Sequence, residues 1–491
     1  MAMREPAPLD LFASRLMRRF RIPGLSLGIS RNGRPILSRG YGWRDRELRR
    51  PASSKTVYGI ASITKSFTAL AILRLEEEGL LRVTDPVVRH LPEFRSPNPR
   101  WTAKISLHHL LTHSSGMPPL AGTYLSQLRS RARDPSFDAR SVRRVGIDLE
   151  AGPLDSFEQL LEYLTTVRYQ PIAPPGHQFS YSNEGFMLLG AVIERSAGRT
   201  YENYLDEQIL RPCGMRHTTC DAGIMLRYPE VTTLYSPQRI RSRVRMVPSQ
   251  NCGMAGILRP AGGLLTNIED LLRYLEIFRT GGRAGRERIL TPKSVSKMLR
   301  PAIPIDTDRF YGYGIVVRPA YHGHLVAYHG GGTKGVSSEF AVVPRKGICG
   351  AVLANVERVP SFNVLFAGIN RQLGLPMSTP FFETPSVVSR AGPLAEFEGW
   401  YWGGDGFKCN VRAGRRELTL RFWELDGNTH VVRAAPCGTD RFLIRLFGLP
   451  WTIRFVRDAS KRVSAVFVSY WWYRRRTEQE VRHGRRNRFA W

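Results

Sequence analysis

The stretch Ser62–Gly79 reads SITKSFTALAILRLEEEG and combines a Ser-x-x-Lys tetrapeptide with apolar residues at three- and four-residue spacing. This spacing predicts a helix that ends at Gly79. Positions i and i+3 share a helix face, so the Lys65 amine can reach the Ser62 hydroxyl and activate it as a nucleophile. The tetrapeptide alone is weak evidence, because Ser294-Val295-Ser296-Lys297 repeats it in a segment without other chemical signals.

A second candidate element is Tyr181-Ser182-Asn183, which follows the turn Pro174-Pro175-Gly176 and precedes a predicted helix over Gly185–Ser196. A tyrosine can accept the serine proton as a general base, and an asparagine two residues later can bind a substrate amide. Tyr201-Glu202-Asn203 has the same spacing but lies in a helical pattern, where positions i and i+2 do not face each other.

A third element is His329-Gly330-Gly331-Gly332, between the apolar run Leu325–Tyr328 and the predicted strand Ser337–Val343. Glycines at the edge of a strand let a substrate approach the backbone N–H groups, as an oxyanion hole requires. The alternative interpretation is a hairpin turn that happens to contain a histidine.

The order of elements around these motifs predicts an α+β domain. A hairpin over Gly24–Gly40, with Asn32-Gly33 at its bend, opens the chain, and apolar β-branched runs return between Tyr313 and Ala354. Helical patterns lie between them, over Ser62–Gly79, Gly185–Ser196 and Asn267–Thr280. We therefore expect an antiparallel sheet completed by the two ends of the domain, with helices on its faces.

The C-terminal part has a different pattern. Residues 376–392 are rich in proline and small polar residues and predict a linker. Short apolar runs then recur about every ten residues, which is typical of a small antiparallel barrel. The predicted division is a domain over 1–375, a linker over 376–392, and an all-β barrel with a basic tail over 393–491. Its tryptophans are expected to form the barrel core: Trp400, Trp402, Trp423, Trp471 and Trp472.

Taken together, the three motifs follow the order and spacing of the penicillin-recognising serine hydrolases. Over roughly residues 10–370 the chain resembles the class C β-lactamase-like family, which includes D-alanyl-D-alanine carboxypeptidases, D-aminopeptidases and family VIII esterases. "HHLLTHSSGMP" at His108–Pro118 and "HGGGTKGVSSEFAVVP" at His329–Pro344 extend the match. The barrel is similar in placement to the lipocalin-like modules of some D-amino-acid-specific peptidases of this group.

The resemblance implies a β-lactamase/transpeptidase-like fold and a role for each motif residue. Ser62 would be the acylated nucleophile, Lys65 its activating neighbour, and Tyr181 the general base that later acts as general acid. Asn183 would orient the substrate amide, and the N–H groups of Ser62 and Gly332 would form the oxyanion hole, with Gly331 in the same substrate-binding strand. His329 stands where many relatives carry lysine, which disfavours recognition of a substrate carboxylate because imidazole is largely neutral at pH 7.

The expected function is hydrolysis of a small amide or ester through an acyl-enzyme on Ser62, with D-amino-acid-containing peptides as the leading substrate class. A carboxylesterase or weak β-lactamase of the same family is the alternative. From another class, a noncatalytic binding or scaffolding protein could keep the fold, but all four polar motif residues are present. We expect a small-molecule or short-peptide substrate, no cofactor, and possible homo-oligomers.

Charge and composition limit which partners, metals and compartments we expect. The chain has 72 Lys and Arg against 42 Asp and Glu, a formal net charge of +30. The excess is spread along the chain, so nucleic acid is not expected as the main partner; the tail Tyr473–Trp491 and the segment Gln127–Arg144 are its densest parts. The six cysteines are scattered without C-x-x-C pairs, and the histidines lack the H-E-x-x-H pattern, so we expect no metal site. The sequence has no long apolar run, so we expect no membrane span. Together these features predict a cytoplasmic protein.

Overall fold

The computed structural model describes residues 8–132, 152–221, 223, 228–240, 243–249, 256–388, 393–423, 429–477 and 480. The chain divides into two compact units, each built from two separate segments. The first unit consists of Met1–Asp85 and Phe186–Phe381, and the second of Pro86–Gly185 and Phe382–Trp491.

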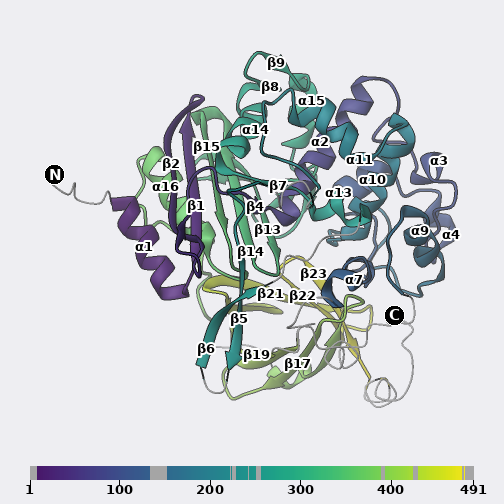
Figure 1. The fold of residues 1–491 in the computed structure, drawn as a ribbon. Helices are drawn as coiled ribbons and strands as arrows, with labels where there is room; N and C mark the ends of the chain where they lie inside the picture. Colours follow the sequence, from purple (N-terminus) through teal and green to yellow (C-terminus); the bar gives the residue numbers. More distant parts are fainter. Residues whose placement is uncertain are drawn as a thin grey trace. The chain divides into compact units, whose positions relative to one another are not determined.

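The first unit contains a nine-stranded antiparallel sheet with the order β10-β11-β12-β13-β14-β15-β1-β2-β3 (Figure 1). Its first strand, β1, pairs with its last, β15, so the two ends of the predicted domain complete one sheet, as expected. The strands are β1 Gly24–Arg31, β2 Arg34–Asp45, β3 Arg50–Pro51, β10 Ile303–Pro304, β11 Phe310–Tyr311, β12 Val316–Tyr321, β13 His324–Thr333, β14 Val336–Val343 and β15 Ile348–Ala354.

The β1–β2 hairpin turns where the sequence predicts it. Asn32 and Gly33 connect the strands with φ values of 50° and 79°. Positive φ at both central residues is the requirement of a type I′ turn, which Asn-Gly meets at low cost.

Helices cover both faces of this sheet. On β1, a Cβ added to Gly28 would meet Ile268 and Leu272 of α14 (Ile268–Thr280), whereas the next residue, Ile29, packs on Gly368 of α16 (Ser361–Leu373). Successive residues of a strand point to opposite faces, so α14 and α16 lie on opposite sides. Helix α1 (Pro8–Phe20) contacts α16.

The remaining elements of the first unit support the Ser-x-x-Lys segment. Helix α2 runs over Thr64–Glu77, and a 3-10 turn, η1, holds Ala61–Ile63. Ser62 thus lies in a turn before the helix, not inside the helix that the periodicity predicts. The other elements of this unit are α11 Tyr201–Leu205, η2 Asp206–Leu210, η3 Gly256–Leu258, α13 Arg259–Gly262, α15 Pro292–Met298, η4 Pro344–Lys346, and the two-stranded pairs β4 Tyr58–Gly59 with β7 Leu265–Thr266, β5 Leu234–Ile240 with β6 Arg243–Ser249, and β8 Arg283–Ala284 with β9 Glu287–Arg288. Helix α10 spans Asn183–Ala197.

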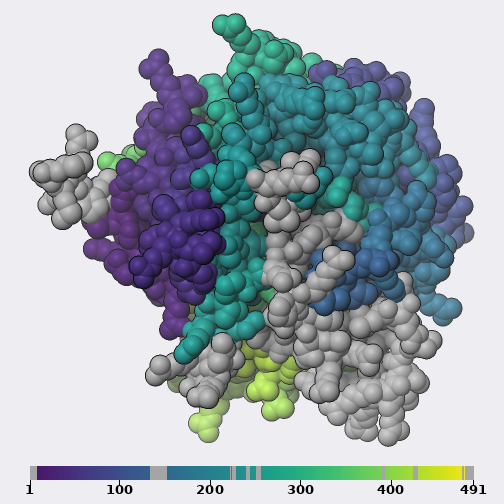
Figure 2. Space-filling view, in the orientation of Figure 1, coloured from purple at the N-terminus to yellow at the C-terminus, as the bar shows by residue number. Residues whose placement is uncertain are grey.

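An open groove lies beside strand β6 of the β5–β6 hairpin. Figure 2 shows this hairpin in teal beside the purple N-terminal elements. Arg21 and Arg46 donate hydrogen bonds to the carbonyl groups of Val244 (2.7 Å) and Met246 (3.0 Å) on β6. The groove has a volume of about 720 Å³ and is lined by α1, β2 and β6, without any of the predicted site residues.

The second unit contains short helices and a closed eight-stranded antiparallel barrel. The helices are α3 Val87–His90, α4 Pro99–Thr102, α5 Leu107–Leu111, α6 Gly122–Leu125, α7 Leu128–Ala132 and α9 Phe157–Thr166. The barrel follows a 3-10 turn, η5 Leu394–Phe397, and consists of β16 Gly399–Trp402, β17 Lys408–Ala413, β18 Leu418–Trp423, β19 Thr429–Gly438, β20 Arg441–Leu446, β21 Leu449–Arg457, β22 Val463–Val468 and β23 Trp471–Arg476. β22 and β23 are separated by a short turn that contains Ser469, where φ is 61°.

The expectation that tryptophans form the barrel core is wrong for four of the five. The interior contains Tyr401, Phe422 and Tyr473. Neighbouring residues on a strand point to opposite sides, so Trp400, Trp402, Trp423 and Trp472 face outward. Only Trp471 packs against the core, as a partly buried residue. The core is instead made of smaller side chains, including Leu418, Leu420, Phe442, Ile444, Ile453 and Phe455.

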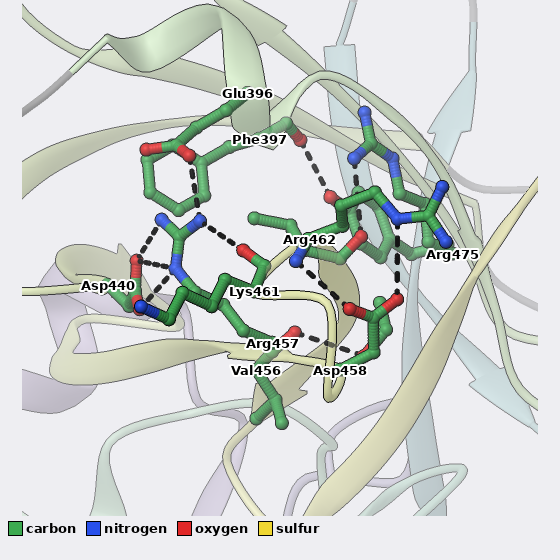
Figure 3. A network of polar contacts seen from close by, with 12 residues as sticks. Glu396, Phe397, Asp440, Val456, Arg457, Asp458, Lys461, Arg462 and Arg475 are labelled. Atoms are coloured by element: carbon green, nitrogen blue, oxygen red, sulfur yellow. Dashed lines mark hydrogen bonds and ion pairs between the residues drawn. The ribbon is translucent and has the colours of Figure 1, made fainter.

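Arg457 links three segments at one end of the barrel through hydrogen bonds (Figure 3). Its guanidinium donates to both carboxylate oxygens of Asp440, at 2.7 and 2.9 Å, and to Glu396 Oε2 at 2.8 Å. It also donates to the carbonyl of Lys461 at 2.9 Å. One side chain therefore connects η5, the β19–β20 turn and the β21–β22 turn, with the bidentate geometry that favours arginine.

Between α16 and η5 the described residues contain no helix or strand. The exact domain boundaries remain a prediction. Of the two basic segments, residues 133–144 and 481–491 lie outside the described residues. In the described ranges, none of the helices combines the length and the apolar character that crossing a bilayer demands.

Candidate active site

Ser62 and Lys65 are brought together as the sequence predicts. Lys65 Nζ donates to Ser62 Oγ at 3.2 Å and to the carbonyl of Ala261 on α13 at 2.6 Å. The Lys65 side chain is fully buried, and its Nζ lies 5.5 Å from the ring centroid of Phe186. Ser62 itself is half-buried between buried neighbours. The lysine is therefore held in one position beside the more accessible hydroxyl.

The second Ser-x-x-Lys tetrapeptide has a structural role. Lys297 Nζ forms an ion pair with Glu76 Oε2 at 2.6 Å, and Ser294 follows the N-cap Thr291 of α15. The lysine is bound to a carboxylate of α2 instead of a serine. The two copies are thus distinguished by the groups around each lysine.

The HGGG segment lies inside β13 and not in a hairpin turn. β12 pairs with β13 only as far as Tyr328. Beyond that point, His329–Thr333 pair with β14 on one side, and no strand among the described residues pairs with them on the other. A Cβ added to Gly332 would meet no described atom within 4 Å, whereas one on Gly331 would lie 2.2 Å from the Ile60 carbonyl oxygen. The open edge at Gly332 is a place where a substrate can approach the backbone.

His329 is buried, and both of its ring nitrogens are bound. Nδ1 lies 2.7 Å from the carbonyl oxygen of Gly330, which can only accept, so Nδ1 carries the proton. Nε2 then accepts from the hydroxyl of Tyr311 at 2.9 Å. Burial, together with the nearby Lys65 charge, lowers the pKa of His329 to about 3. The imidazole is therefore neutral at physiological pH, with no proton left for a substrate carboxylate.

Tyr181 and Asn183 lie in the second unit's segment Ser180–Gly185, where Asn183 is the first residue of α10. His113 holds this segment, because its carbonyl accepts from the Ser180 N–H at 2.7 Å and its Nδ1 accepts from the Ser182 N–H at 3.1 Å. The His113 and Tyr181 rings lie 4.1 Å apart. His113 was visible in the sequence only as one of several histidines, without a signal for this role.

The barrel contributes to the environment of Tyr181. The carbonyl of Tyr470, in the β22–β23 turn, accepts from the Tyr181 N–H at 3.4 Å, and the Trp471 ring meets the Tyr181 ring edge-on at 4.8 Å. Next to it, Trp472 Nε1 donates to the Phe179 carbonyl at 2.8 Å. Sequence reasoning missed this turn, because no glycine, proline or asparagine marks it.

A fully buried carboxyl group follows Asn183. Glu184 Oε2 accepts from Ser182 Oγ at 3.1 Å, and Oε1 accepts from the Thr123 N–H at 3.2 Å. Burial raises the pKa of Glu184 to about 7, and the negative charge of the barrel residue Asp405 adds to the rise. Partial burial of Asp405 raises its own pKa to about 6.

His109 has a structural role at the start of α5. His109 Nδ1 accepts from the Ser106 N–H at 3.1 Å in a capping box at the start of α5. Burial is the main cause that lowers the pKa of His109 to about 4. Within the ranges that the structure describes, no three His, Cys, Asp or Glu side chains are arranged to hold a metal ion.

Known proteins share this architecture. Residues 9–370 match the family described as Beta-lactamase. Esterase EstB of Burkholderia gladioli is 31% identical over 296 residues, which cover 56% of this chain and 70% of the esterase. Protein flp of Staphylococcus aureus strain MW2 is 31% identical over 213 residues, which span 43% of this chain and 37% of that protein's length.

The solved structure of the octameric penicillin-binding protein homologue from Pyrococcus abyssi aligns with a TM-score of 0.66 and 27% identity, covering 95% of this chain and 98% of that one. The family match covers the sheet, the helices around it and the Ser-x-x-Lys, Tyr-x-Asn and HGGG segments. The chain therefore belongs to the Beta-lactamase family and is a serine hydrolase.

Proposed function

We propose that the protein hydrolyses small neutral esters and amides through an acyl-enzyme on Ser62. The arrangement of the Lys65 amine, bound to Ser62 Oγ at 3.2 Å and otherwise enclosed, supports activation of that hydroxyl. Tyr181 is the proposed general base, and Asn183 the proposed amide-orienting residue.

In the proposed reaction Tyr181 accepts the Ser62 proton, and Oγ attacks the substrate carbonyl carbon. The N–H groups of Ser62 and Gly332 stabilise the oxyanion. Tyr181 then returns the proton to the leaving alcohol or amine, the C–O or C–N bond breaks, and water releases the acid from the acyl-serine.

The observation that carries the substrate class is the state of His329. A lysine at this position would offer a permanent charge to a substrate carboxylate, but the neutral imidazole has both nitrogens bound within the protein. We therefore propose substrates without an essential carboxylate beside the scissile bond. Simple esters meet this condition, and so do D-amino-acid amides and peptides recognised through their acyl side; β-lactams with a free carboxylate do not.

The test measures initial rates on a short-chain p-nitrophenyl ester and a D-amino-acid p-nitroanilide. Ser62→Ala should abolish both activities while the protein stays folded, and Ser294→Ala, in the second Ser-x-x-Lys copy, should keep them. Retention of activity by Ser62→Ala would overturn the proposal. Amide cleavage would identify a peptidase, and ester cleavage alone an esterase.

A second measurement tests the role of His329. The free acid and the methyl ester of one β-lactam are compared as acylating substrates. We expect the neutral ester to react at least about tenfold faster in kcat/KM, which corresponds to about 1.4 kcal/mol. A preference for the acid would contradict the proposed substrate class.

Assembly and compartment complete the proposal. The octameric state named for the Pyrococcus abyssi homologue supports a homo-oligomer for this chain as well, to be checked by light scattering after size exclusion. The five cysteines in the described ranges are free thiols, which supports a reducing compartment such as the cytoplasm.

A further inference from the structure

The carbonyl group of Ile60 connects the Ser62 turn to the β13 edge. Ser338, on the neighbouring strand β14, donates from Oγ to the Ile60 carbonyl at 2.8 Å and lies 3.3 Å from the carbonyl oxygen of Gly331. Ser338 is fully buried, and Gly331 is its register partner across the ladder. One hydroxyl therefore contacts both the turn before Ser62 and the strand that carries Gly332.

The turn that this hydroxyl holds is strained. Ala61, between Ile60 and Ser62, has a φ of 44°, which an alanine rarely adopts. The Ile60 carbonyl also accepts from the Ile63 N–H at 3.2 Å, and the Ala61 carbonyl accepts from Thr64 Oγ1 at 2.7 Å. Such a conformation persists only where its surroundings hold it. From β14, Val336 packs against Ala61 and Ser338 donates a hydrogen bond to the Ile60 carbonyl.

The backbone of Gly331 packs closely against the Ile60 carbonyl and the Ser338 hydroxyl. A Cβ at position 331 would lie 2.2 Å from the Ile60 carbonyl oxygen and 2.3 Å from Ser338 Oγ. The strand backbone, the hydroxyl and the turn therefore touch directly. These contacts connect the backbone on the Ser62 side to the strand that carries Gly332.

We propose that Ser338 is a positioning residue that sets the separation of the two oxyanion donors. The inference rests on the proposed function, in which those donors belong to Ser62 and Gly332. Oxyanion donors act on charge that develops in the transition state, so misplacing them lowers kcat and leaves ground-state binding almost unchanged. The Ser338 hydroxyl touches no reacting atom in this scheme.

The experiment compares Ser338→Ala with Ser337→Ala, using the ester substrate. Ser337 is the adjacent buried serine, and its Oγ accepts from the Val359 N–H at 3.4 Å. We expect kcat of Ser338→Ala to fall by about 10- to 100-fold with KM within about threefold of wild type, because small displacements of catalytic groups have effects of this size. Ser337→Ala should keep kcat within about threefold of wild type.

Two further measurements separate positioning from loss of folded protein. Titration with a fluorophosphonate counts reactive sites, so that kcat is expressed per site. Ser338→Cys keeps a side chain of similar size with a weaker donor, and its kcat should lie between those of Ser338→Ala and wild type. Wild-type kcat per site in Ser338→Ala or Ser338→Cys would overturn the inference, as would a fall in kcat matched by Ser337→Ala. Full activity in Ser62→Ala would instead overturn the proposed function.

Discussion

Lys65 and Lys297 show how one local sequence pattern leads to different residue environments. Both follow a serine by three positions, yet Lys65 Nζ contacts Ser62 Oγ and the Ala261 carbonyl, whereas Lys297 contacts the Glu76 carboxylate. Lys65 therefore lies beside the hydroxyl that we propose as the nucleophile, whereas Lys297 lies beside a carboxylate. The two motifs differ in the group that contacts each lysine from outside the tetrapeptide, which is the Ala261 carbonyl for Lys65 and the Glu76 carboxylate for Lys297.

We predict that Lys65→Ala lowers kcat/KM for the ester by at least about 10³-fold, because the group beside the nucleophile is removed. Lys297→Ala removes an ion pair whose lysine is about one-third exposed and should cost less than about 1 kcal/mol of stability with little loss of activity. Steady-state rates and urea unfolding of both variants check this. Similar activities for the two variants would contradict a catalytic difference between the motifs.

Glu184 predicts a pH dependence of stability. Its pKa in the folded protein is about 7, raised from 4.5 mainly by burial, so the folded state binds the proton more tightly than the unfolded state. The stability that this proton contributes is complete below pH 4.5 and is lost as the pH rises through about 7. The loss amounts to about 3 kcal/mol.

Glu184→Gln should remove this component, because a neutral amide can replace the protonated carboxyl beside Ser182 and Thr123. The free energy of unfolding of the variant, relative to wild type, should increase between about pH 5 and about pH 8. Urea unfolding at both values measures it, with Glu158→Gln on α9, an exposed carboxyl group, as the control. A difference that stays constant with pH would exclude titration of Glu184 in this range.

At the scale of elements, the β22–β23 turn joins the barrel to the segment that carries Tyr181. The Trp472 indole donates to the Phe179 carbonyl, and Tyr470 and Trp471 contact Tyr181. The barrel therefore forms part of the packing around a proposed catalytic residue within the second unit.

Trp472→Phe keeps an aromatic side chain, although a smaller one, and removes the indole N–H that donates to the Phe179 carbonyl. We expect a loss of about 1 to 3 kcal/mol in stability and a reduced kcat, because the Tyr181 segment is less firmly held. Trp423→Phe, on the outward side of β18, should change kcat little. Calorimetry and ester kinetics of both variants test the prediction, which fails if Trp472→Phe retains full kcat and stability.

For the whole molecule, the net charge of +30 implies self-repulsion in the compact state. Raising NaCl from about 20 mM to about 200 mM shortens the screening length and should increase the Tm. Scanning calorimetry measures the effect, with sucrose of equal osmolarity as the control for excluded solute. A Tm that falls with salt would show that specific ion pairs, such as those of Arg457, outweigh the overall repulsion.

Local patterns account for much of what the sequence predicts correctly. The Asn32-Gly33 turn, the helix predicted over Asn267–Thr280, the recurring apolar runs of the barrel and the three-residue spacing of Ser62 and Lys65 all depend on neighbours along the chain. The family resemblance, which rests on the order of such motifs, likewise follows from the linear sequence and is confirmed by the match over residues 9–370.

Other features depend on residues brought together only by folding. The hydrogen bond from Ser338 to Ile60 spans 278 positions, and that from Trp472 to Phe179 spans 293. His329 is neutral because burial and the nearby Lys65 charge lower its pKa. Trp472 faces the outside of the barrel because the turn at Ser469 sets its place on β23. Periodicity and spacing describe near neighbours, whereas contacts, burial and dielectric environment come from distant segments, so these properties were decided by the tertiary structure alone.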